Sequence, residues 1–107
     1  MSKEAPRSYR RFVERYPKLG EAWDAMRAAE ESAGPLDDRT RRLLKLAVAV
    51  GACREGSVHS AARKAVGAGI AAEELEQVVA LAASTIGMPA TVAAHGWLRD
   101  VLDADDG

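Results

Sequence analysis

Apolar residues along the first third of the chain recur at helical rather than strand spacing. Leu19, Trp23 and Met26 fall three or four residues apart on an otherwise charged segment. This spacing predicts a helix over residues 17–33 with one apolar stripe. A Gly-Pro pair follows at once, and proline cannot continue the helix, so we expect it to end there.

The next segment has the most apolar pattern in the chain. An aspartate pair, Asp37-Asp38, can cap a helix that runs through RTRRLLKLAVAVGAC. Its second half, residues 43–52, is apolar nearly all round apart from Lys45. A helix that is apolar on every side belongs inside a protein, so we expect this one to be the central buried helix.

Three further helical segments follow, and glycines separate them. The pattern predicts helices over residues 55–66, 71–85 and 90–102. Glycine tolerates the left-handed geometry that often ends a helix, which suits both Gly67-Ala68-Gly69 and Gly87-Met88-Pro89 as the breaks between them. No internal repeat or low-complexity linker is present.

These elements make one small all-α domain. Alanine is the commonest residue and β-branched runs are scarce, which favours helices over strands. A chain of 107 residues holds one domain with a modest core. We therefore predict a single-domain helical bundle of about five to six helices, with an N-terminal helical segment at 1–35, a core at 36–102 and a frayed acidic tail at 103–107.

Charge and hydropathy exclude several classes of protein. The 15 Lys and Arg against 16 Asp and Glu give a net charge of −1, without the basic excess of a nucleic-acid binder. The uncharged window at 78–94 is rich in small residues and interrupted by glycine and proline, so we expect no membrane span and no membrane partner. The polar N-terminus lacks a secretory signal, and Cys53 is the only cysteine. We expect a soluble cytoplasmic protein.

Small-residue surfaces on two predicted helices favour self-association. The runs AVAVGA at 47–52 and VVALAAS at 78–84 permit close contact between helices, and leaving them exposed would create a large apolar patch. We expect a homo-oligomer, the common arrangement for such chains. The alternative is a monomer whose alanine-rich faces pack inward.

Three motifs in the middle of the chain carry a family resemblance: LDDRTRRLLKLAVAV, HSAARKAVGAG and the helix start EEL. With them, residues 36–94 resemble the carboxymuconolactone decarboxylase family, which shares the alkylhydroperoxidase D-like fold. The resemblance implies an all-helical subunit that assembles through its central apolar helices as a homo-trimer or homo-hexamer.

The redox members of that family use a glutamate, a C-x-x-C pair and a histidine. In the register fixed by Ala65 and Gly69, this chain has other residues at those positions: Arg42, Arg54, Ser57 and Ala61. A C-x-x-C cycle needs a second thiol to resolve the sulfenic acid, and one chain with one cysteine lacks it. Peroxiredoxin activity would therefore rest on Cys53 alone, with an external thiol.

A further subgroup of the family carries the pattern E-G-x-V-H-S-H, which this chain matches over EGSVHS at 55–60, with Ala61 in place of the second histidine. Glu55 and His59 lie four residues apart and therefore on one face of a helix. A carboxylate beside an imidazole fixes its tautomer and suits it to act as a general base. We name His59 as the candidate base and Glu55 as its orienting partner; the alternative is an ordinary surface pair on a helix.

Arg42, Ser57 and His95 are the candidate substrate-binding residues. Arg42 can clamp an anion or pair with Glu55, and such pairing would quench the carboxylate as a base. The Ser57 hydroxyl offers hydrogen bonding or capping. If His95 met Glu55 and His59, they would form a facial metal triad; the alternative is a histidine bonded to backbone. We assign no metal and no cofactor.

The resemblance implies an acid–base enzyme acting on a small carboxylate or lactone. One alternative is a single-cysteine alkylhydroperoxidase with peroxiredoxin-type activity. The other is a non-catalytic oligomer that binds a small acid or a partner protein. In the last case Arg42 would pair with Glu55 and leave no free base.

Overall fold

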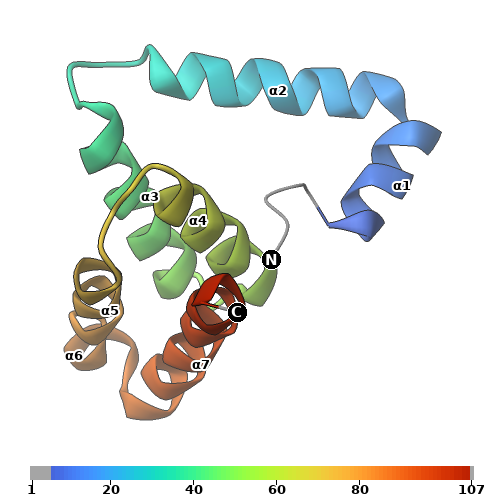
Figure 1. Cartoon of the computed structure of the whole chain (residues 1–107). Helices are drawn as coiled ribbons and strands as arrows, with labels where there is room; N and C mark the ends of the chain where they lie inside the picture. Colours follow the sequence, from blue (N-terminus) through green and yellow to red (C-terminus); the bar gives the residue numbers. More distant parts are fainter. Residues whose placement is uncertain (1–5, 107) are drawn as a thin grey trace. The chain divides into compact units, whose positions relative to one another are not determined.

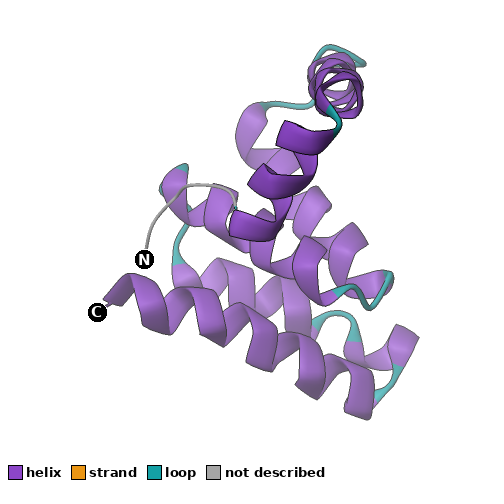
Figure 2. Ribbon diagram, turned by 90° about the vertical axis from the view of Figure 1, so that its right-hand side faces the viewer, coloured by secondary structure: helices purple, strands orange, loops and turns teal. Residues whose placement is uncertain are grey.

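The computed structural model describes residues 6–106, and in this range the chain consists of helices and the loops between them, with no strand (Figure 2). In chain order the helices are α1 (Arg7–Arg15), α2 (Pro17–Glu31), α3 (Asp38–Gly51), α4 (Glu55–Gly67), α5 (Ala72–Ala80), α6 (Ala83–Ile86) and α7 (Met88–Asp106). The predicted all-α fold class is therefore confirmed. None of the helices within 6–106 combines the length and the hydropathy that a membrane-spanning segment needs.

The described chain divides into two compact units, the first at residues 6–38 and the second at residues 39–106. In the first unit α1 packs against α2, and the buried Gly20 permits their close approach, because a Cβ there would lie 3.1 Å from the Val13 side chain. The sequence predicted a helical segment at 1–35 but placed a helix only over 17–33, so it did not identify α1 as a helix of its own; the α1 segment is polar and carries only a short apolar stripe. The predicted stripe on α2 lies half-exposed on this unit.

In the second unit α7 is the central element, and it packs against α4, α5 and α6 (Figure 1). The apolar residues of its buried face recur every three or four positions, as one face of a helix requires. The core of the unit consists of Leu46, Ala49, Val50, Val58, Ala62, Ala65, Ile70, Leu75, Val79, Ala94, Leu98, Val101 and Leu102.

The prediction that α3 is wholly buried is wrong for the single chain. One side of the helix is buried, but Leu44 and Val48 on α3 are 47% and 69% exposed. The physical reason is that this short unit has only enough helices to cover one side of α3. An ion pair between Arg39 and Glu74 joins α3 to α5.

Two helix boundaries differ from the prediction. The expected helix over 71–85 is divided into α5 and α6, although no glycine or proline marks the break. Gly87, with φ +89°, ends α6, and α7 begins at once with Pro89 in its first turn. The helix α7 continues to Asp106, through most of the predicted acidic tail at 103–107; residues 1–5 and Gly107 lie outside the described residues.

Candidate functional site

The packing of α4 against α7 brings three polar side chains together. Nε2 of His59 on α4 lies 3.0 Å from Oδ2 of Asp100 on α7. Glu55 lies one turn before His59, and one ligand atom from each of the three residues lies within 4.8 Å of the other two. We refer to Glu55, His59 and Asp100 as the α4–α7 cluster.

Buried apolar residues on both helices hold this cluster in place. On α4, Val58 directly precedes His59 and is fully buried; on α7, Asp100 lies between the buried Leu98 and Val101. The two backbones are therefore fixed by the core. The side chains themselves open to solvent: that of His59 is 25% exposed and that of Asp100 is 61% exposed.

The contact with Asp100 determines which nitrogen of His59 carries the proton. An ionised carboxylate only accepts hydrogen bonds, so Nε2 of a neutral His59 must donate to Asp100. The lone pair of the ring then lies on Nδ1. This arrangement gives His59 a fixed tautomer and a lone pair on Nδ1, which together suit it to act as a general base.

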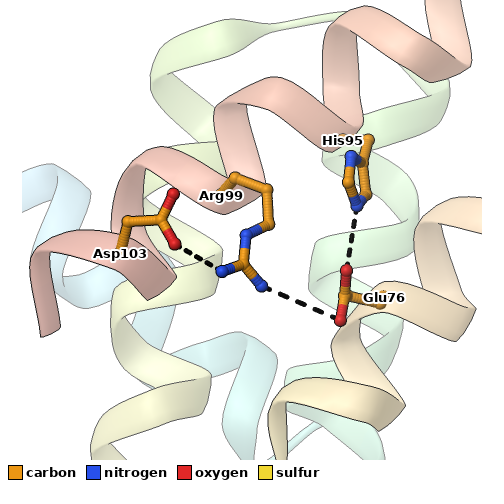
Figure 3. Close-up of polar contacts among 4 residues, drawn as sticks. All are labelled: Glu76, His95, Arg99 and Asp103. Atoms are coloured by element: carbon orange, nitrogen blue, oxygen red, sulfur yellow. Dashed lines mark hydrogen bonds and ion pairs between the residues drawn. The ribbon is translucent and has the colours of Figure 1, made fainter. Parts of the chain in front are cut away.

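His95 lies in a separate polar network between α5 and α7 (Figure 3). Its Nε2 atom is 2.9 Å from Oε2 of Glu76 on α5. Arg99, one turn further along α7, approaches the other oxygen of Glu76 at 3.9 Å and also pairs with Asp103 (Figure 3). This network ties α5 to α7 at the surface.

The structure does not bring His95 to Glu55 and His59, so the metal triad considered for these three residues does not form. Among the described residues, Asp100 occupies the third position instead. The reason is helical geometry: His95 and Asp100 are five residues apart on α7, which turns them roughly 140° from one another. His95 therefore faces α5 while Asp100 faces α4.

The remaining candidate residues lie on α3, in the α3–α4 turn and at the start of α4. Arg42 is half-buried on α3, and Ser57 is exposed in the first turn of α4. Cys53 is exposed in the turn between the two helices with φ +55°, and its Sγ lies 4.0 Å from the carbonyl oxygen of Gly51. Cys53 thus lies two residues before Glu55, the first residue of α4 and a member of the α4–α7 cluster.

Sequence reasoning missed Asp100, which lies 41 residues from His59. Its only sequence signal is weak: an acidic residue in the apolar-flanked run WLRDVL, off the buried face of its helix. Sequence reasoning gave Glu76 no role either. Both residues acquire their roles from the docking of α7.

The comparison with protein families matches residues 17–100 to the carboxymuconolactone decarboxylase family. The match extends beyond the resemblance seen in the sequence at both ends, and it includes all three residues of the α4–α7 cluster. Searches of curated proteins and of solved structures gave no significant match. Since the match covers well over half of the chain and the fold is all-helical, this chain belongs to the carboxymuconolactone decarboxylase family.

Proposed function

We propose that this protein is a carboxymuconolactone decarboxylase-like enzyme that performs acid–base chemistry on a small carboxylate or lactone. The observation that carries the proposal is the 3.0 Å contact between His59 and Asp100. It supplies an oriented imidazole with a free lone pair on Nδ1, next to the carboxylate of Glu55. Family membership supports the class of substrate.

In the proposed reaction His59 moves one proton. Nδ1 takes a proton from a carbon beside the carbonyl of the substrate, and the Asp100 carboxylate stabilises the imidazolium that forms. The electron pair of the broken C–H bond passes into the carbonyl as an enolate. In a decarboxylation, the substrate carboxylate leaves as carbon dioxide instead. The electron pair of the broken C–C bond then forms the enolate, and a protonated His59 donates a proton to the carbon.

Arg42 is the proposed anion clamp for the substrate carboxylate. Its guanidinium presents donors in a planar fork that matches a carboxylate, and its half-buried position on α3 suits recognition of an anion. Ser57 keeps its proposed role in substrate binding. His95 pairs with Glu76 on α5, on another side of α7 from Asp100, so it is not proposed as a substrate-binding residue.

A proton-exchange assay tests the acid–base proposal. A panel of small β-keto acids and lactone carboxylates is incubated with the protein in D2O containing a chelator, and deuterium incorporation and carboxylate loss are followed by proton NMR. We expect His59→Asn to lower the rate about 10²–10⁴-fold, because general acid–base catalysis contributes that much.

The matched control for this assay is His95→Asn, which removes the other histidine–carboxylate contact on α7. It should leave proton exchange at the wild-type rate. Full activity in His59→Asn would contradict the proposal. Binding of a panel acid without exchange, lost in Arg42→Ala, would support the non-catalytic binding protein instead.

Single-cysteine peroxidase activity is the second candidate, because the Cys53 thiol is exposed. In that reaction the thiolate attacks the O–O bond, forming a sulfenic acid and releasing an alcohol, and an external dithiol reduces the sulfenic acid. We expect only slow, stoichiometric loss of the thiol in an organic hydroperoxide, since the chain has no second cysteine. Thiol titration with Cys53→Ser as the blank measures this; loss within seconds and catalytic peroxide consumption would favour the peroxidase.

We further propose that the protein assembles as a homo-trimer or homo-hexamer through α3. Leu44 and Val48 lie one turn apart on this helix and are both exposed, which leaves an apolar face for another copy. The other proposed partner is a small acid, with no nucleic acid or membrane involved. We propose a cytoplasmic location, since a lone exposed thiol suits a reducing compartment.

A further inference from the structure

We infer that the α4–α7 cluster is a binding site for one divalent first-row transition-metal ion, with Glu55, His59 and Asp100 as its protein ligands. This inference goes beyond the proposed acid–base function and does not rest on it. It rests on the geometry of the three side chains, their ligand chemistry and their fixed backbone positions.

The geometry of the cluster suits a single ion. Bonds from nitrogen or oxygen to such an ion are about 2.0–2.2 Å long, so ligand atoms around it lie roughly 3–4 Å apart. In the cluster one ligand atom from each residue already lies within 4.8 Å of the others. Both carboxylates belong to exposed residues, and a small rotation of either side chain closes the remaining gap.

The ligand types select the class of metal. Imidazole nitrogen favours ions such as zinc, iron and nickel over magnesium and calcium, and the two carboxylates supply negative charge for a dication. An ion between Glu55 and Asp100 would also remove the repulsion between their two carboxylates. Three protein ligands leave coordination positions open for water or a small carboxylate.

The packing of the helices makes the site more than a chance surface group. Two ligands come from one face of α4 and the third from α7, 41 residues from His59. Because the core fixes both helices, the three ligands are held near one another before an ion binds. A bound ion would cross-link α4 and α7 and should therefore raise the melting temperature.

Metal binding and the proposed base would exclude one another. A metal-bound His59 uses the ring nitrogen that faces Asp100, so its proton must move to Nδ1. The lone pair needed for proton abstraction is then lost. The ion is consequently an inhibitor of the acid–base reaction, and the two proposals can fail separately because the exchange assay contains a chelator.

Isothermal titration with Zn²⁺ tests the metal site in the full chain. The measurement uses a Cys53→Ser background so that the thiol cannot bind zinc. We expect one ion per chain, and we expect His59→Asn and Asp100→Asn each to weaken binding at least about 10-fold. His95→Asn is the matched control and should bind Zn²⁺ as the background chain does, because the His95–Glu76 pair lies outside the cluster.

Thermal unfolding followed by circular dichroism gives a second readout on the same proteins. Saturating Zn²⁺ should raise the melting temperature of the background chain and of His95→Asn by about 5 °C or more, but not that of His59→Asn. No heat of binding at 100-fold excess of Zn²⁺ would overturn the inference. Binding that survives His59→Asn, or that disappears in His95→Asn, would overturn it equally.

Discussion

Replacing Leu98 by Ala should lower the free energy of unfolding by about 2–5 kcal/mol. Leu98 is fully buried on α7, the helix that packs against α4, α5 and α6. The substitution removes apolar contacts and leaves a cavity in the core of this unit, and the surrounding side chains can only partly collapse into it. Urea denaturation followed by helical circular dichroism measures the loss.

Val92→Ala is the matched control for this prediction, because Val92 lies on the same helix and is 61% exposed. Its effect should stay within about 0.5 kcal/mol. The denaturant dependence of the free energy should be the same for both variants, which would show that only native stability has changed. Equal destabilisation by the two variants would contradict the docking of α7 described above.

The sequence predicted helices well where apolar spacing and helix-breaking residues agreed. The start of α2 at Pro17, the start of α4 at Glu55 and the break at Gly87 all carry such signals. The helix α1 was missed because its charged residues outnumber its apolar ones. The break between α5 and α6 was missed because a run of small apolar residues crosses it without glycine or proline.

The candidate site was predictable only within one helix. Helical spacing alone places Glu55 beside His59, since both lie on α4. Periodicity cannot tell which residue of another helix faces that pair, because this depends on the angle at which α7 docks. For that reason the sequence considered His95, whereas the structure places Asp100 there.

Burial of α3 shows a further limit of sequence patterns. The pattern correctly identified a helix with apolar residues on more than one side, but it contains no information about what covers each side. Within the chain, Leu46 and Val50 face the core, while Leu44 and Val48 stay exposed. A second copy of the chain is the proposed cover for that face.

Replacing Val48 by Asp should therefore convert the proposed oligomer into single chains. Val48 is 69% exposed in the chain, so a carboxylate at this position remains hydrated in the folded monomer. In an assembly the same carboxylate would be buried without a partner, which should raise the dissociation constant about 100-fold or more. Size-exclusion chromatography with light scattering measures the mass of both proteins.

Met26→Asp provides the matched control, because it places the same charge on a half-exposed apolar residue of α2. It should leave the mass of the assembly unchanged if α3 alone forms the contact. Unchanged helical circular dichroism in Val48→Asp would show that the chain itself remains folded. A wild-type protein that runs as a monomer, or a Val48→Asp variant that stays assembled, would contradict the interface, and the exposed face of α3 would then need another partner.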